Sequence, residues 1–227
     1  MREIVLDTET TGLDPVEGHR IIEIGCVELE DHYPTGKTLQ LFLNPERTVP
    51  AETLRIHGIT DEFLADKPLF SAVADEFFDF IGDSPLVIHN ASFDLKFLNS
   101  ELHRIGRATL PYARTIDTIE IAKARMPGAR YSLDELCKRF GVDLSVRAVH
   151  GALTDAKLTA QVYLELVGGR QRSLALAAAE EVGGDGVRIA ARPRPVPLEN
   201  LATLAELEAH AAFIARELGA SAVWNWR

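Results

Sequence analysis

The sequence predicts an α/β domain of about 169 residues, followed by a tail of different composition. Two observations predict the domain: short apolar runs typical of buried strands alternate along the chain with stretches whose apolar residues recur at helical spacing. A third marks its end, since Gly168-Gly169 leads into residues 183–197, which are rich in Gly, Pro and Arg. The tail is therefore expected to be a flexible linker that ends in a short helix.

Four strands are expected in the first ninety residues. Residues 3–8 contain the apolar run Ile-Val-Leu and an acid at its end, which indicates a buried strand leading into a loop at Gly12. Residues 20–29 partly alternate, and residues 38–43 alternate apolar and polar side chains, so an antiparallel meander is predicted after the first strand. Residues 86–89 are expected to form another buried strand.

Helices are expected between and after these strands. Ser71 is a suitable N-cap for the first, and Gly106 ends the second. Ser132 and Glu135 form a capping box before a helix that ends at Gly141. The expected helices span residues 71–81, 92–105, about 132–141, about 152–167 and about 201–218.

Composition excludes several classes of protein. The 227 residues are 46% hydrophobic and 26% charged, which is typical of a globular protein with a core and not of a disordered chain. No apolar run approaches the roughly 18 residues of a membrane span, and the chain starts without a secretory signal, so a cytoplasmic protein with no membrane partner is expected. Cys26 and Cys137 stand far apart and indicate neither a disulfide framework nor a zinc site.

The charge is acidic and unevenly distributed. The chain has 24 Lys+Arg and 34 Asp+Glu, a net charge of −10. From residue 170 onward seven Arg balance seven acids, so the whole net charge lies in the domain. This argues against binding nucleic acid by bulk charge, but not against an enzyme that meets nucleic acid through metal ions.

Four acids lie where strands end or helices begin. Asp7 and Glu9 are two residues apart in an extended segment, so their carboxylates point to the same side. Asp94 follows the buried strand at 86–89, and Asp155 lies in the first turns of the helix after His150. Such ends gather at one edge of an α/β sheet, and an all-carboxylate set suits Mg²⁺ or Mn²⁺.

Each of these residues also has a plainer interpretation. An Asp in the first turn of a helix is commonly a capping residue, and a D-x-E pair is commonly part of a solvated face. His150 alone could be a structural hydrogen-bonding group. The residue types therefore leave a metal-dependent phosphoryl-transfer site and a set of structural acids both open, while their conjunction favours the site.

Three strings resemble the motifs of the DEDDh exonuclease family: DTETTG at 7–12, HNASFD at 89–94 and HGALTD at 150–155, in this order. Within it, the segments IHGITDEFLADKP at 56–68 and GARYSLDELC at 128–137 resemble the proofreading subunits of bacterial replicases. The resemblance implies a ribonuclease H-like fold with a mixed central sheet flanked by helices, and 3′ to 5′ removal of nucleotides from a DNA end.

Carried over residue by residue, the resemblance implies that Asp7, Glu9, Asp94 and Asp155 hold two divalent metal ions, Mg²⁺ or Mn²⁺. It implies that His150 is the general base, and the histidine five residues before Asp155 indicates the histidine branch of the family rather than its tyrosine branch. His57 and His89 are alternative bases, less favoured because they lack this offset from a metal ligand.

The same resemblance implies a substrate pocket around the acids. Leu13 would be an apolar wedge at the terminal nucleotide, and the alternative for Leu13 and Phe93 is a place in the core. The residues implied to contact substrate are Asp7, Glu9, Thr10, Gly12, Leu13, His57, Asn90, Phe93 and Asp155.

The tail contains two segments suited to protein partners. Residues 171–176 (QRSLAL) resemble peptides that bind the sliding clamp, the beta subunit of bacterial replicases, through Gln171, Ser173, Leu174 and Leu176; a continued helix is the alternative. Trp224 and Trp226 are typical of a docking segment, which the resemblance places on the polymerase's alpha subunit, whereas a tail folded back on its own domain is the alternative.

We therefore expect a catalytic domain at 1–169, a linker at 170–198 and a docking segment at 199–227. The function expected is proofreading of single-stranded or mispaired 3′ DNA ends within a replisome at the nucleoid. A small theta-like subunit is a further partner that the resemblance suggests. One alternative is a stand-alone exoribonuclease resembling ribonuclease T or oligoribonuclease, against which the linker and tryptophans argue. A non-catalytic interaction module is another, against which the intact set of acids and His150 argues.

Overall fold

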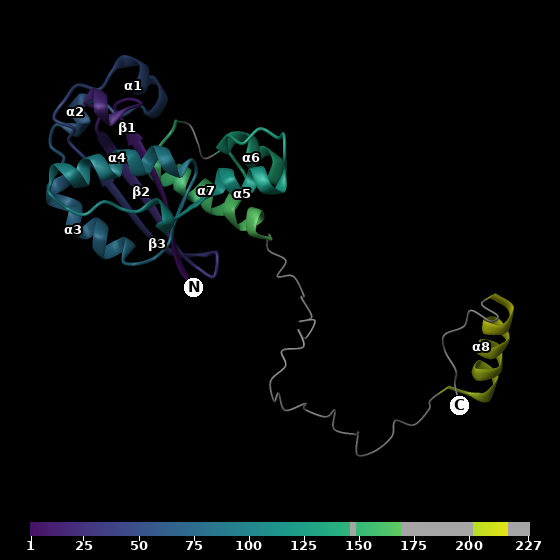
Figure 1. Cartoon of the computed structure of the whole chain (residues 1–227). Helices are drawn as coiled ribbons and strands as arrows, with labels where there is room; N and C mark the ends of the chain where they lie inside the picture. The colour runs from purple at the N-terminus through teal and green to yellow at the C-terminus, as the bar shows by residue number, and fades with distance from the viewer. Residues whose placement is uncertain (146–148, 169–201, 218–227) are drawn as a thin grey trace, which may run out of the picture. The chain divides into compact units, whose positions relative to one another are not determined.

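The computed structural model describes residues 1–145, 149–168 and 202–217. The chain divides into two units, Met1–Leu174 with the sheet and Ala175–Arg227 with helix α8 (Leu204–Glu217) (Figure 1). Helix α8 lies within the helical span expected from the sequence and begins with a capping box between Thr203 and Glu206. The residues predicted to bind the clamp or the polymerase lie outside the described ranges: Gln171, Ser173, Leu174, Leu176, Trp224 and Trp226.

A mixed five-stranded sheet organises the first unit, in the order β3-β2-β1-β4-β5. Strands β1, β2 and β3 are labelled in Figure 1. Strand β1 pairs antiparallel with β2 and parallel with β4, β2 and β3 are antiparallel, and β4 and β5 are parallel. The strands are β1 (Arg2–Thr10), β2 (Ile21–Glu30), β3 (Tyr33–Phe42), β4 (Leu86–Ile88) and β5 (Thr115–Asp117). The predicted meander and the predicted strand after it are confirmed.

Strand β3 is longer than the sequence pattern indicates. It starts at Tyr33 rather than at residue 38, because Asp31 and His32 form a two-residue hairpin turn with φ of 51° and 71°. Pro34 is tolerated in the strand because β3 is at the edge of the sheet, where one side of the backbone has no neighbouring strand to pair with.

Helices cover both faces of the sheet. Ile4 and Leu6 of β1 pack with α3 and α4 on one face, whereas Val5 between them packs with α7 on the other. Helices α5 and α6 pack against α7. The helices of this unit are α1 (Ala51–His57), α2 (Asp61–Leu64), α3 (Phe70–Ile81), α4 (Ala91–Arg104), α5 (Thr118–Arg125), α6 (Leu133–Phe140) and α7 (Ala152–Val167), with 3-10 turns η1 (Pro15–Glu17) and η2 (Tyr112–Arg114).

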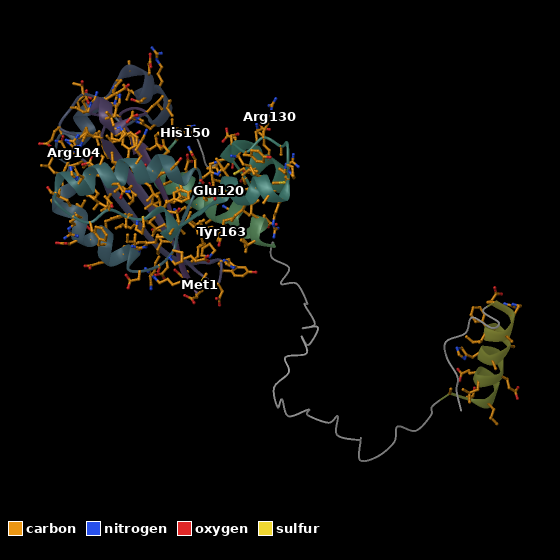
Figure 2. The ribbon with its side chains drawn as sticks, viewed as in Figure 1. Met1, Arg104, Glu120, Arg130, His150 and Tyr163 are labelled. Atoms are coloured by element: carbon orange, nitrogen blue, oxygen red, sulfur yellow. The ribbon has the colours of Figure 1, made fainter. Side chains whose placement is uncertain are left out.

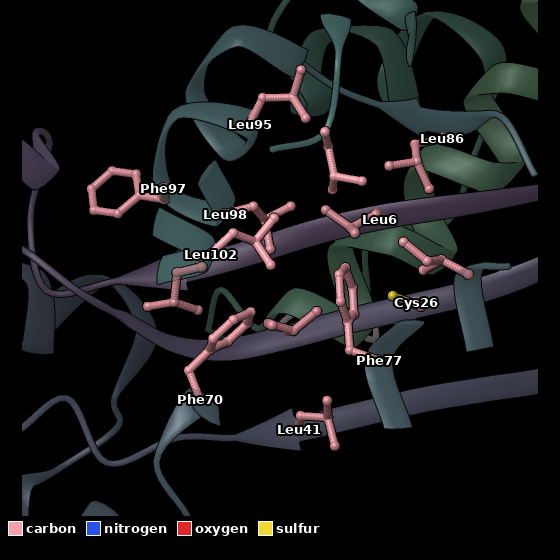
Figure 3. Close-up of a cluster of buried hydrophobic side chains, with 14 of the residues drawn as sticks. Leu6, Cys26, Leu41, Phe70, Phe77, Leu86, Leu95, Phe97, Leu98 and Leu102 are labelled. Carbon is pink, nitrogen blue, oxygen red and sulfur yellow. The ribbon is translucent and has the colours of Figure 1, made fainter. Parts of the chain in front are cut away.

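The largest core cluster lies between the sheet and helices α3 and α4 (Figure 3). Leu6, Phe77 and Leu98 have no exposed surface in this cluster. Each side chain of this kind contributes roughly 1.5–3 kcal/mol by leaving water. The packed cluster holds β1, β4 and α4 in fixed relation, and these elements carry three of the four predicted metal ligands or lead directly to them.

The predicted helix starts have two outcomes. The cap at Ser132 is confirmed, since its hydroxyl accepts a hydrogen bond from the backbone N–H of Glu135 at 3.4 Å. The cap at Ser71 is wrong: α3 begins at Phe70, after Leu69, whose side chain makes no capping bond. Phe70 is buried in the core, so tertiary packing decides this helix start.

Helices α1, α2 and α5 and strand β5 were not predicted. They are short, from three to eight residues, and periodicity cannot be read over so few positions. Within the described ranges, the chain has no helix with the length and apolar character that crossing a membrane requires.

Candidate active site

Asp7 and Glu9 lie near the C-terminal end of β1, the central strand of the sheet. Their side chains share the face on which α7 packs, and in the register of the sheet Asp7 is opposite Gly25 and Glu9 is opposite Glu23. Both acids are half-buried. The sequence prediction that the two carboxylates point to one side agrees with this geometry.

Asp94 comes from the first turn of α4, directly after β4. The chain turns sharply between the two elements at Asn90, which has φ of 72°. The carboxylate of Asp117 holds this turn by accepting backbone hydrogen bonds from Asn90 at 3.3 Å and Ala91 at 2.9 Å. Thr8 Oγ1 donates to Asp94 Oδ1 at 2.7 Å, which joins β1 to α4 inside the site.

Asp155 and His150 come from the start of α7. Asp155 is 4% exposed and its carboxylate Oδ2 lies 3.3 Å from Nδ1 of His150, whose side chain is 47% exposed (His150 is labelled in Figure 2). The backbone N–H of His150 donates to the carbonyl of Ile56 at 3.2 Å. The segment before α7 is thereby attached to the end of α1.

These elements bring the predicted acids together. Ligand atoms of Glu9, His150 and Asp155 all lie within 4.8 Å of one another. Loss of hydration raises the pKa of Asp7 well above its usual range, and the charges of Asp94, Glu9 and Asp155 raise it further. The four carboxylates and His150 therefore form one cluster.

Two acids of the cluster, Asp7 and Asp94, have little compensation from Lys or Arg side chains in the described part of the chain. Among the described residues, no Lys or Arg forms an ion pair with Asp7 or Asp94. Burial raises the pKa of Asp94 to about 7, although the hydrogen bond from Thr8 opposes this and favours the charged form. At neutral pH the cluster must therefore hold protons or cations. Its oxygen donors suit hard divalent ions, so the residues present fit Mg²⁺ or Mn²⁺.

The two alternative bases are placed less favourably than His150. His57 is 3% exposed, and its Nδ1 accepts a hydrogen bond from the backbone N–H of Ile59 at 3.0 Å, so the proton of the neutral ring lies on Nε2. Burial, and then the nearby charge of His150, lower the pKa of His57. His89 Nδ1 is engaged with Thr118 Oγ1 at 2.8 Å.

The loop after β1 carries the next predicted contacts. Thr10 Oγ1 donates to the carbonyl of Gly12 at 2.7 Å. A Cβ at Gly12 would lie 2.2 Å from the ring of His19, so any other residue there would require that ring to move. Leu13 is 77% exposed, so the alternative of a place in the core is wrong for this residue. Its side chain is accessible, as the predicted role of an apolar wedge requires. Lys96 Nζ binds the carbonyl of Leu13 at 3.1 Å and ties this loop to α4.

Three other predicted substrate residues differ in exposure. Asn90 is exposed, whereas Phe93 is half-buried and packs against the core, with its ring centroid 5.1 Å from that of Phe97. Phe93 therefore belongs partly to the core, and the rest of its side chain remains accessible. His57 is buried, and its contact with a nucleotide requires the side chains that cover it to move.

Glu23, Asp117 and Thr8 are residues of this site that the sequence patterns did not single out. Glu23 accepts a hydrogen bond from the backbone of Ala152, which starts α7. An acid inside the otherwise apolar run 21–27 was the available signal for Glu23. Asp117 resembles an ordinary N-cap, and it is indeed the N-cap of α5, so its second contact with the turn at Asn90 had no local signature.

Comparison with known proteins supports a nuclease. The profile of the RNase_T family, described as exonuclease, matches residues 4–163. The DNA polymerase III subunit epsilon of Rickettsia conorii is 58% identical over 174 residues, covering 75% of this chain and 76% of the relative. The DNA polymerase III subunit epsilon of Escherichia coli is 43% identical over 241 residues, covering 99% of this chain and 97% of the relative.

Solved structures show the same fold. Exonuclease X in complex with 5′ overhanging duplex DNA aligns with a TM-score of 0.59 and 28% identity, over 72% of this chain and 90% of that one. The nuclease domain of 3′hExo, a DEDDh family member bound to rAMP, aligns with a TM-score of 0.64 and 22% identity, over 73% of this chain and 91% of that one. The latter likeness bears on the fold alone.

Proposed function

The chain belongs to the RNase_T exonuclease family and is a 3′–5′ exonuclease of the DNA polymerase III epsilon kind. From this premise we propose that its carboxylate cluster and His150 hydrolyse the 3′-terminal phosphodiester bond of a mispaired primer. The observation that carries the proposal is the convergence of Glu9, His150 and Asp155 within 4.8 Å beside Asp7 and Asp94. Four acids gathered at one place, of which Asp7 and Asp94 form no ion pair with a Lys or Arg among the described residues, suit a metal-dependent hydrolase.

Asp7, Glu9, Asp94 and Asp155 would hold two divalent ions, Mg²⁺ or Mn²⁺. When bound, such ions supply an acidified water and stabilise negative charge on the phosphate and the leaving 3′ oxygen. Thr8 keeps Asp94 oriented toward the cluster by its hydrogen bond. Because Asp94 retains a proton up to about pH 7 in the metal-free protein, metal binding releases protons and is favoured by higher pH.

His150 would take the proton of the attacking water. With Nδ1 facing the carboxylate of Asp155 at 3.3 Å, Nδ1 carries the ring proton and Nε2 is the proton acceptor. Its partial exposure gives substrate and water access. His57 is excluded from this task in the described arrangement, because its Nδ1 already accepts a hydrogen bond and its Nε2 carries the proton.

The terminal nucleotide would lie between the loop after β1 and the turn at Asn90. Leu13 is exposed, which suits an apolar wedge against the terminal base pair. Backbone groups of Thr10 and Gly12 would receive the nucleotide, and Asn90 and Phe93 would contact its sugar or base. His57 would donate through Nε2, which is buried without a hydrogen-bond partner among the described residues, once the side chains covering it move.

Further partners are proposed from the residues after 169. The similarity to the Escherichia coli relative extends over 99% of this chain, which supports the same organisation of catalytic domain and tail. Residues 171–176 would bind the sliding clamp, and residues 199–227, with Trp224 and Trp226, would bind the alpha subunit of DNA polymerase III. A small theta-like subunit would bind the catalytic domain.

A tethered exonuclease also fits the charge. The first 169 residues carry the whole net charge of −10, so the domain lacks the basic surplus with which many proteins hold DNA. Bound metal ions would offset the four acids of the site but would not provide that surplus. Binding to the polymerase would compensate by raising the local concentration of primer ends.

The test is excision of a mismatch by the full chain. A DNA primer with a mispaired 3′ nucleotide, the paired primer and a short RNA would be compared with Mg²⁺, with Mn²⁺ and with EDTA. We expect metal-dependent release of the mispaired nucleotide faster than release from RNA. Strong preference for RNA would favour the exoribonuclease alternative, and absence of hydrolysis with either metal would contradict the proposal. Asp7→Asn is the matched inactive control.

A further inference from the structure

Glu23 is a buried acid next to the carboxylate cluster. It lies on β2 opposite Glu9 and is 2% exposed. Its Oε1 accepts a hydrogen bond from Gln40 Nε2 at 2.8 Å, and its Oε2 accepts one from the backbone N–H of Ala152 at 3.1 Å. The negative charge of Glu23 adds to the repulsion felt by Asp7. The charge of Glu23 therefore raises the electrostatic energy of the cluster. We look to its hydrogen bonds for the reason that an acid stands at this position.

The bond to Ala152 replaces a cap that α7 lacks. The residue at the N-cap is Gly151, which has no side chain to accept a hydrogen bond from the first turn. A carboxylate at this end also interacts favourably with the helix dipole. Glu23 therefore caps α7 from the sheet, across 129 positions of sequence.

Gly25 brings the same turn of α7 onto the sheet. A Cβ at Gly25 would lie 2.2 Å from the backbone nitrogen of Leu153 and 2.3 Å from the carbonyl carbon of Ala152. Gly25 is opposite Asp7 in the register of the sheet. The backbone of α7 thus rests on β2 directly beside Asp7, and Glu23 holds it there by a hydrogen bond.

The start of α7 determines where two site residues lie. Asp155 is in its first turn, and its N–H donates to the carbonyl of Gly151 at 2.9 Å, while His150 immediately precedes Gly151. We propose that Glu23 is a positioning residue for the exonuclease reaction: by accepting the hydrogen bond of Ala152 it fixes the first turn of α7 and so holds Asp155 and His150 against Asp7 and Glu9. This inference rests on the proposed function of those residues.

Two substitutions separate positioning from metal binding. Glu23→Gln keeps an oxygen that accepts from Ala152 and removes the charge, and the amide of Gln40 can turn to present its oxygen to the new side chain. Glu23→Met keeps the length and removes the acceptor. A positioning residue tolerates Gln and not Met, whereas a fifth metal ligand tolerates neither.

Glu28→Ala is the control variant. Glu28 is another buried acid of β2, 6% exposed, and it bonds Arg2 and Thr35 away from α7. Its loss should lower the melting temperature without changing kcat. It therefore shows what a purely structural loss on the same strand looks like.

The measurements are kcat and KM on a single-stranded DNA oligonucleotide, Mn²⁺ affinity by calorimetry, and hydrogen exchange in a peptide covering residues 150–158. For Glu23→Met we expect kcat and Mn²⁺ affinity to fall about 10- to 100-fold, the range measured for groups that orient metal ligands, with KM changed about twofold or less. Exchange should accelerate in 150–158 alone. Glu23→Gln should keep kcat within about threefold of the original chain, by the same reasoning.

Three results would overturn the inference. One is a Glu23→Met chain that matches Glu28→Ala, with a lower melting temperature but unchanged kcat and exchange. Another is Glu23→Gln losing Mn²⁺ binding as fully as Glu23→Met does. If Glu23→Met does not fold, Glu23→Gln decides, since a loss of kcat beyond about tenfold contradicts positioning. An original chain without nuclease activity would refute the proposed function instead, while the exchange comparison would still test the cap.

Discussion

Replacing Asp94 by asparagine should stabilise the metal-free protein while abolishing its activity. The side chain is 3% exposed and its pKa is raised to about 7, chiefly by loss of hydration. Asparagine has nearly the same shape, and its amide oxygen can still accept the hydrogen bond from Thr8. The substitution therefore removes a buried charge without creating a cavity or an unpaired hydroxyl.

The size of the effect follows from the pKa of Asp94 in the folded and unfolded chains. The folded protein keeps the proton up to about pH 7, whereas the unfolded chain releases it near the ordinary value of 3.8. The stability that protonated Asp94 contributes is therefore fully present below pH 3.8, and it is lost progressively as the pH rises from there through about 7. At about 1.36 kcal/mol per pH unit, the loss is roughly 2 kcal/mol at pH 5.5 and about 4 kcal/mol at pH 8. Asparagine is neutral and avoids it.

The assay is urea unfolding in EDTA at both pH values, for the original chain and Asp94→Asn. We expect the variant to be more stable at pH 8 by up to about 4 kcal/mol and by about half as much at pH 5.5. Adding Mn²⁺ should stabilise the original chain and not the variant, since ligand binding to the folded state raises stability only where the site is intact.

An exposed acid on α3 provides the matched control. Asp79→Asn should leave the pH dependence of unfolding unchanged, because Asp79 is exposed. The reasoning is refuted if Asp94→Asn is less stable than the original chain in EDTA at pH 8, or if the difference between them shrinks as the pH rises. Either result would mean that Asp94 is not an uncompensated buried charge.

The remaining predictions concern the base, one buried network and the tail. His150→Gln should lower kcat about 10²- to 10⁴-fold, measured in single turnovers, with Mn²⁺ still bound; an unchanged rate would remove His150 as the base. Tyr163→Phe should lower the free energy of unfolding by about 1–3 kcal/mol, because the buried carboxylate of Glu3 loses a donor that lies 2.7 Å away; denaturant titration checks this, and no loss would contradict it. Deleting residues 199–227 should abolish co-purification with the polymerase subunit and leave hydrolysis of free oligonucleotides intact, whereas parallel loss of both would contradict the modular arrangement. Replacing Gln171, Leu174 and Leu176 by alanine should weaken binding to the sliding clamp in a fluorescence titration. An unchanged affinity would contradict the assignment of residues 171–176 as the clamp-binding peptide.

Local patterns predicted most of the framework that carries the site. The strand ending in Asp7, the helix holding Asp94 and the helix holding Asp155 are each specified by apolar residues at the period of their element. The same segments carry the three motifs, so the order of the acids along the chain could be interpreted together with the fold. The short elements α1, α2, α5 and β5 escaped prediction because too few positions establish a period.

By itself, then, the sequence placed the four acids and His150 at or next to the ends of elements that their own neighbours specify, and the resemblance of its three motifs marked them as the expected site residues. Only the tertiary structure decided that Glu23 caps α7, that Gly25 admits its backbone beside Asp7, and that His57 is buried with Nδ1 as an acceptor. The first two depend on contacts between β2 and α7, far apart in the chain, and the third on how α1 is packed. Hydrophobic periodicity indicates which face of an element is buried, but not which backbone or side-chain groups of another element contact that face.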